Sequence, residues 1–170
     1  MAKVNLKNFE RDMQKILDEA LDRGTMKSIG DELARRIKTR TQLGRGVNKT
    51  GGPSVPLAKL ADSTTNSRRR KRENGDLSAL TAPKKSNLTE TGQMLESIRV
   101  TEVKDGQVTI AAAGTRSDGK RNDDVASYAE DGSNNRPKRK FLDLSGAELN
   151  ALQRSVRDRI ETVIKRLLTK

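Results

Sequence analysis

Hydrophobic side chains recur at three- and four-residue steps along residues 1–42, with polar residues between them. This spacing places the apolar side chains on one face of an amphipathic helix. The stripe consists of Leu6, Phe9, Met13, Ile16, Leu17, Ala20, Leu21, Met26, Ile29, Leu33 and Ile37. Because glycine suits the residue that follows a helix end, the pattern predicts two helices, or one helix broken near Gly24.

The same spacing returns in residues 145–170. Ser145 is followed three residues later by Glu148, which is the arrangement of a capping box at the start of a helix. The apolar face consists of Leu149, Leu152, Val156, Ile160, Val163, Ile164, Leu167 and Leu168. We predict a C-terminal helix packed on the core. A seam between two chains is the alternative, although three turns of heptad spacing do not establish a coiled coil.

Apolar and polar residues alternate in residues 97–104 and 107–113, on either side of Asp105-Gly106. A two-residue Asp-Gly loop favours a type I′ β-hairpin. That register pairs Val103 with Val108 and Thr101 with Ile110, and it leaves apolar side chains on both faces. We therefore expect a sheet covered on both sides, by the helices on one side and by a neighbouring chain as a candidate for the other.

Shorter signals surround this hairpin. Residues 114–124 are rich in glycine and charged side chains and are interpreted as an exposed loop. Residues 125–129 are predicted to form a third short strand, and residues 140–144 another extended segment. Together with the hairpin they make residues 91–144 a β region.

Periodicity fails in residues 43–90, which contain many glycine and proline residues and the largest share of the excess positive charge. A structureless connection of this length is unusual inside a compact domain. The segment is therefore either disordered or an arm that becomes ordered against another subunit. The fold class that follows is α+β in a single domain, residues 1–170. N-terminal helices (1–42) and a C-terminal helix (145–170) pack on a small antiparallel sheet centred on the hairpin 97–113, and a long extended basic arm (43–90) projects from it.

The composition of the chain limits the catalytic and metal-binding groups that it can offer. The chain has 170 residues, with 35 Lys+Arg against 23 Asp+Glu, a net charge of +12, and no His, Cys or Trp. The absence of imidazole and thiol groups removes the commonest general base, nucleophile and metal ligands. Carboxylate pairs such as Asp123-Asp124 lie among Lys and Arg on predicted surfaces. We therefore expect a protein that is not an enzyme and that uses no cofactor, metal or small molecule.

The hydropathy of the chain bears on its location. No apolar run is long enough to cross a membrane, and residues 1–7 lack the apolar region of a signal peptide. The expected location is a cytoplasm, or an assembly built there.

The strongest charge feature is a run of five cations: Arg68, Arg69, Arg70, Lys71 and Arg72. Such a run contacts phosphates in many nucleic-acid-binding proteins. The only aromatic residues, Phe9, Tyr128 and Phe141, are too few for a base-stacking platform. The residues favour an arm that docks electrostatically on an acidic protein, with direct DNA binding and a solvated loop as the alternatives.

Three short segments resemble motifs of the neck and tail-completion proteins of tailed bacteriophages, which include the virion morphogenesis proteins of Mu-like phages and the head–tail joining proteins of lambda-like phages. Residues 88–98 are similar to the family's "L-x-x-T-G-x-L-x-x-S-I" entry into a central hairpin. Residues 128–132 resemble a shortened "Y-A-x-x-x-x-G" segment, and residues 136–145 resemble "P-x-R-x-F-L-x-L-S". The matching residues are Thr91, Gly92, Leu95, Ile98, Tyr128, Gly132, Arg139, Phe141, Leu142 and Ser145.

The resemblance implies scaffold roles for these residues. Gly92 is expected to turn the backbone before Leu95 enters the core. Tyr128 is expected to bury its ring while its hydroxyl reaches a polar partner. Phe141 and Leu142 are expected to anchor the last helix on the sheet.

The resemblance also implies a function. The chain would be a structural subunit of a homo-oligomeric ring in the virion neck, with a hexamer favoured and a dodecamer as the alternative. Its expected partners are a portal-side adaptor or stopper, the tail terminator, and the genomic DNA that passes through the lumen. The length of the arm favours lateral reach to an acidic neighbour over lining the lumen. The alternative function is a small basic nucleic-acid-binding protein.

Overall fold

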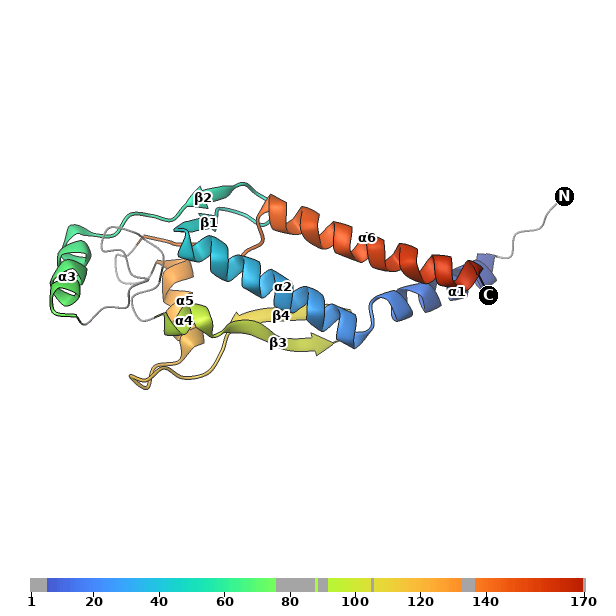
Figure 1. Ribbon diagram of the computed structural model, residues 1–170, viewed down its shortest axis with the longest axis horizontal. Coiled ribbons are helices and arrows are strands. Elements are labelled where there is room, and N and C mark those ends of the chain that lie inside the picture. The colour runs from blue at the N-terminus through green and yellow to red at the C-terminus, as the bar shows by residue number, and fades with distance from the viewer. Residues whose placement is uncertain (1–5, 76–87, 89–91, 105, 133–136, 170) are drawn as a thin grey trace.

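The computed structural model describes residues 6–75, 88, 92–104, 106–132 and 137–169, and the chain is elongated (Figure 1). The helices are α1 (Leu6–Ala20), α2 (Arg23–Gln42), α3 (Asp62–Glu73), α4 (Gln93–Glu96), α5 (Asn122–Asp131) and α6 (Gly146–Leu168). The strands are β1 (Arg45–Val47), β2 (Ser54–Pro56), β3 (Ile98–Lys104) and β4 (Gln107–Ala112). Helix α3 lies at one end, and α1 lies with the end of α6 at the other. The fold is α+β, as predicted.

The break in the N-terminal stripe lies at Leu21-Asp22, slightly before the predicted position. Asp22 caps α2 because its carboxylate accepts a hydrogen bond from the backbone N–H of Thr25 at 2.6 Å. This bond lowers the pKa of the Asp22 carboxyl from its ordinary value. Gly24 therefore lies in the first turn of the second helix and does not terminate the first.

The β3–β4 hairpin contains a β-bulge that the sequence pattern did not reveal. Val103 pairs with Val108 as predicted, but Val100 pairs with Ile110, so the predicted pairing of Thr101 is wrong. Thr101 is the extra residue, and its hydroxyl donates to the Thr109 carbonyl at 3.3 Å. An extra residue shifts the alternation of side chains by one position.

The shift gathers the apolar side chains of both strands on one face. These side chains are Ile98, Val100, Val103, Val108, Ile110 and Ala112. Helix α2 covers this face along the length of the hairpin (Figure 1). The other face carries exposed Arg99, Glu102 and Thr109. The expectation of a sheet that is apolar on both sides is therefore wrong, because the bulge was not foreseen.

A glycine lets α2 approach the sheet closely. A Cβ atom on Gly30 would lie 2.5 Å from Val108 Cγ1 and 2.6 Å from Val100 Cγ2. Both distances are far below van der Waals contact, so the helix and the strands meet at this point only because residue 30 has no side chain.

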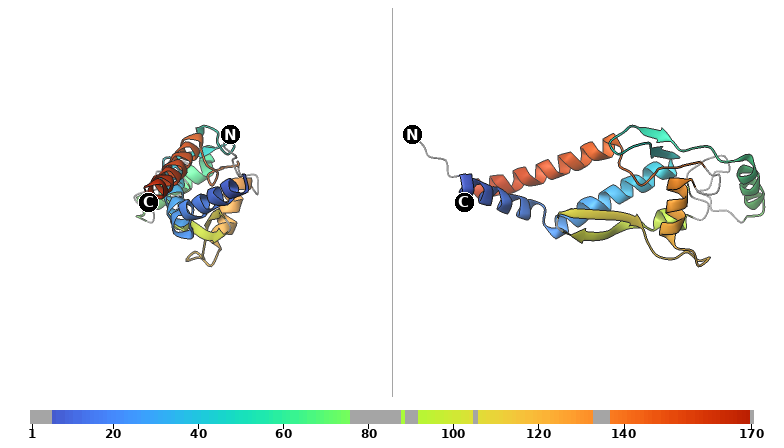
Figure 2. Two further views of the ribbon diagram at one scale, coloured as in Figure 1. Left: turned by 90° about the vertical axis from the view of Figure 1, so that its right-hand side faces the viewer. Right: turned by 180° about the vertical axis from the view of Figure 1, so that it is seen from behind.

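The main core lies between α2, the strands, and the short helices α4 and α5. It consists of Ala34, Ile37, Met94, Leu95, Ile98, Ala112, Ala126 and Phe141. Leu142 and Leu144 pack against it from the segment that precedes α6. Helix α6 then runs obliquely to the far end of the molecule, where it packs on α1 (Figure 2).

Two sequence interpretations of the middle of the chain are wrong. Residues 125–129 belong to α5 and not to a strand. Val125, Ala126 and Ala129 all face the core, which is a helical spacing, and Asp123 and Asp124 lie in the first turn, where acids favour a helix. Residues 140–144 form no strand, because bends at Leu142 and Asp143 interrupt them.

The described part of residues 43–90 contains regular structure that the lost periodicity concealed. Strands β1 and β2 pair as a hairpin, with Gly46 opposite Val55. A Cβ on Gly46 would lie 2.0 Å from the Lys140 carbonyl oxygen, so this hairpin packs backbone to backbone on the body of the domain. Helix α3 follows, and residues 76–87 and 89–90 lie outside the described residues.

We predict that Gly30→Ala lowers the free energy of unfolding by about 1–2 kcal/mol, since overpacking outweighs the gain in helix propensity. The matched control is Gly24→Ala on the same helix, where the nearest atom would be 3.5 Å away. This control is expected to leave stability unchanged or to raise it by up to about 1 kcal/mol. Urea midpoints measure both variants. Equal effects of the two substitutions would contradict the close approach at Gly30.

Candidate functional site

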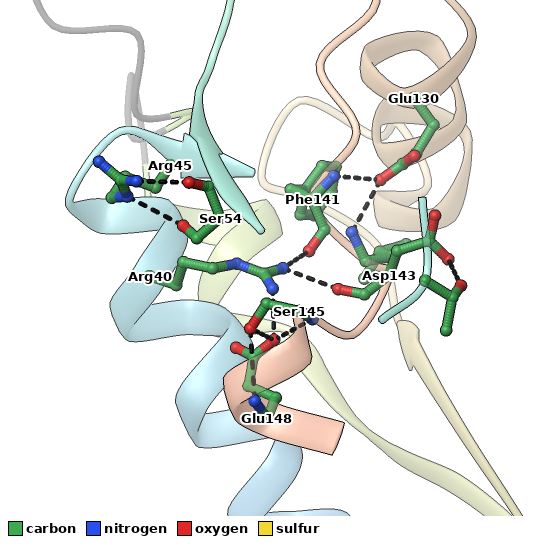
Figure 3. A network of polar contacts seen from close by, with 10 residues as sticks. Arg40, Arg45, Ser54, Glu130, Phe141, Asp143, Ser145 and Glu148 are labelled. Carbon is green, nitrogen blue, oxygen red and sulfur yellow. Dashed lines mark hydrogen bonds and ion pairs between the residues drawn. The ribbon is translucent and has the colours of Figure 1, made fainter. Parts of the chain in front are cut away.

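A buried network of polar contacts is centred on Arg40, in the last turn of α2 (Figure 3). Its guanidinium donates to the carbonyl oxygens of Phe141 and Asp143, the latter at 2.9 Å, and forms an ion pair with Glu148 of α6. Arg40 and Glu148 are both buried. Burial lowers the pKa of the Arg40 guanidinium from its ordinary value, and the negative charge of Glu148 opposes this shift.

Glu148 also completes the capping box predicted for α6. Its Oε2 atom accepts from the Ser145 backbone N–H and from the Ser145 hydroxyl, each at 2.7 Å. The Ser145 oxygen accepts from the Glu148 backbone N–H at 3.4 Å. The cap is thereby joined to Arg40, so the start of α6 is fixed to the end of α2.

The segment between α5 and α6 is held from two further sides. Glu130 of α5 accepts from the backbone N–H groups of Phe141 and Leu142, at 2.6 and 2.8 Å. The β1–β2 hairpin adds a bond from Val47 N–H to the Lys140 carbonyl at 3.0 Å. We call residues 139–148 with their partner Arg40 the polar junction, since four elements meet there.

The polar junction is a framework of fixed hydrogen bonds, within which the buried Nε atom of Arg40 is the donor that has no hydrogen-bond partner. No group of His, Cys, Asp and Glu in the described residues could hold a metal ion. Within that same part of the chain, no helix has the length and hydrophobicity needed to span a bilayer. The hydrogen bonds of the junction orient the elements that meet there.

Several residues of the phage-like motifs occupy such framework positions. Gly92 has a left-handed φ of 76° at the start of α4, and Leu95 is buried in the core as expected. Ile98 is buried in the same cluster. Gly132 ends α5 with a φ of 71°. These two glycines adopt a backbone conformation that side chains disfavour. Thr91 lies outside the described residues.

Arg139 connects the body of the domain to the segment that leads into α3. Its guanidinium donates to the carbonyl oxygens of Ala58 and Lys59, at 3.2 and 3.0 Å. The side chain is buried. Arg139 therefore fixes the place where this segment leaves the domain.

Tyr128 departs from its predicted role. Its side chain is 52% exposed, so the ring is not buried. The prediction placed Tyr128 on a strand, whereas it lies on α5 with Ala126 and Ala129 directed to the core instead. Phe141, by contrast, is fully buried as expected.

The five-cation run lies on helix α3 and not in an extended arm. Arg68 is buried and has a partner within the chain. Arg69, Arg70, Lys71 and Arg72 are exposed. The run is therefore one anchoring arginine followed by four cations on the surface.

The apolar face of α6 is only partly covered. A cavity of about 530 Å³ separates Leu152 and Val156 of α6 from Ile29 and Leu33 of α2 and from Val108 of β4. Leu167 and Leu168 at the end of the helix are exposed. Sequence periodicity predicted this face but not the distance between the two helices.

The chain was compared with known protein families, proteins and structures. No protein-family model matches the chain, and neither the curated proteins nor the solved structures contain a match.

We predict that Arg40→Met lowers the free energy of unfolding by about 3–5 kcal/mol, because Glu148 then stays buried without its counter-charge. The control is Arg36→Met on the same helix, which removes an exposed ion pair with Glu32 and is expected to cost under about 1 kcal/mol. Chemical denaturation at neutral pH compares them. A similar small loss in both variants would show that the polar junction does not hold α6 in place.

The exposure of Tyr128 gives a second prediction. Tyr128→Ala is expected to change the free energy of unfolding of the isolated chain by less than about 0.5 kcal/mol, as for most surface substitutions. Phe141→Ala is expected to cost about 3–5 kcal/mol, because it leaves a cavity in the core. Thermal and urea unfolding measure both. A Tyr128 effect close to that of Phe141 would restore the buried role predicted from sequence.

Proposed function

We propose that the chain is a structural subunit of the neck of a tailed bacteriophage, where copies form a ring between the DNA-filled head and the tail. One observation carries the proposal. The three segments that resemble the phage motifs are separated along the sequence, yet they converge on one core. Leu95 and Ile98, Ala129, and Phe141 with Leu142 all belong to or pack against that cluster.

This convergence supports the resemblance because each segment contributes to the scaffold of the domain. The first begins α4 and β3, the second ends α5 at Gly132, and the third enters the polar junction and caps α6 with Ser145. Structural roles for these residues also agree with a function in assembly rather than in catalysis.

The proposed mechanism is assembly by burial of surface between copies. The half-buried apolar side chains of α6 and exposed Leu168 are surfaces that the single chain leaves uncovered. We expect six copies in the ring, with twelve as the alternative that would match a portal. The proposed partners are a portal-side adaptor or stopper, the tail terminator, and the genomic DNA that crosses the lumen. The proposed location is the virion neck, assembled in the cytoplasm of the bacterial host.

Interruption of the gene in its phage tests the proposal. We expect DNA-filled heads and separate tails to accumulate, because neither would find the connecting surface. A plasmid copy of the chain should restore joined particles, and electron microscopy of lysates counts them. The protein should also be present in purified joined particles, as measured by mass spectrometry.

Normal joining without the chain would refute a neck role. If the chain were also absent from particles but bound to host or phage DNA, the alternative of a small basic nucleic-acid-binding protein would replace the proposal.

A further inference from the structure

Helix α3 is unusual because it has no apolar face. Its twelve residues, Asp62–Glu73, are Asp, Ser, Thr, Asn, Arg, Lys and Glu only. A helix that is polar all round is not held by a hydrophobic core. None of the other described helices and strands packs extensively on α3, which lies at the end of the molecule opposite to α1 (Figures 1 and 2).

The exposed cations surround the axis of this helix. Consecutive residues of an α-helix are rotated by about 100°, so Arg70 points away from buried Arg68 and Arg69 points to one flank. Lys71, which also has a partner within the chain, and Arg72 lie on either side of Arg68. Buried Arg68 marks the side that faces the chain. The positive charge therefore does not form a single stripe, as it would on a helix that docks on a flat surface.

The first half of α3 carries short polar side chains instead: Ser63, Thr64, Thr65, Asn66 and Ser67. Hydroxyl and amide groups of this kind, together with Arg and Lys, make most contacts to phosphate oxygens in protein–DNA complexes. Every turn of the helix thus presents a group that binds phosphate.

We infer that α3 is a binding surface for the sugar–phosphate backbone of duplex DNA. A major groove about 12 Å wide admits one helix and places a phosphate backbone on either side of it, which matches cations on several sides. An acidic protein surface would meet only one side. The absence of aromatic side chains on α3 argues against single-stranded nucleic acid, whose bases stack on such rings.

The sequence alone favours an acidic protein partner, partly because an extended arm would reach sideways to a neighbouring protein. Residues 45–56 instead form a hairpin packed on the domain, and only the segment around α3 projects. Contacts made to phosphates alone are independent of sequence and permit sliding, so they do not prevent DNA from moving past the protein.

Salt dependence of DNA binding by the full chain tests the inference. Any protein with a net charge of +12 attracts DNA, so the comparison uses two variants of equal charge. One variant carries R69Q, R70Q and R72Q on α3. The other carries R154Q, R157Q and K165Q, all at exposed positions of α6. Fluorescence anisotropy with a short random-sequence duplex gives the affinity at a series of salt concentrations.

The slope of log affinity against log salt is expected to become shallower by roughly 0.9 for each α3 cation removed. In the α6 variant the total change in this slope should stay below about 0.9, the value expected for one phosphate contact. Glutamine keeps helix propensity, and circular dichroism checks that α3 variants fold. R70Q alone, which removes one outward-facing cation, should show a single step.

Equal changes in the two triple variants would overturn the inference, because the effect would then belong to net charge. An unchanged slope for the α3 variant would overturn it as well. Tighter binding of the parent chain to polyglutamate than to duplex at equal salt, lost in the α3 variant, would assign α3 to an acidic protein instead. The inference does not rest on the neck proposal: DNA binding is measured on the isolated chain, and head–tail joining is measured in the phage.

Discussion

The ion pair between Arg40 and Glu148 is the interaction on which the arrangement of the long helices depends. Arg40 ends α2, which covers the sheet, and Glu148 begins α6, whose C-terminal half packs on α1. The same guanidinium holds the carbonyl oxygens of residues 141 and 143. Because a buried ion pair tolerates little change in geometry, this contact fixes the angle at which α6 leaves the core.

Local signals in the sequence were sufficient for local structure. The capping box of Ser145 and Glu148 and the two helices of the N-terminal stripe could be predicted, because each depends on residues a few positions apart. The turn at Gly92 was implied by the resemblance to the phage motifs. The burial of Arg40 could not be predicted, since its partners lie about a hundred residues later in the chain. The spacing of residue types along the sequence predicts contacts between near neighbours only, and not a contact between residues this far apart.

The errors have equally physical causes. Alternation alone cannot reveal an inserted residue, so the bulge at Thr101 stayed hidden until the register with β4 was known. A short run of Val and Ala fits either a strand or a helix, so the sequence around Tyr128 does not decide which side chains face inward. An all-polar helix has no hydrophobic period to detect, so the sequence of the basic run predicts an extended segment.

The bulge in β3 also sets limits on how this chain can evolve. Point substitutions on the outer face, at positions such as Arg99 and Thr109, meet solvent and are free to drift. Loss of the codon for Thr101 would remove the extra residue, so Glu102 would follow Val100 directly and the pairs with β4 would join into one regular ladder. Val103 would still face α2 and Glu102 would still face solvent. Related sequences are therefore expected both with and without the extra residue, while the positions of Val100 and Val103 stay apolar.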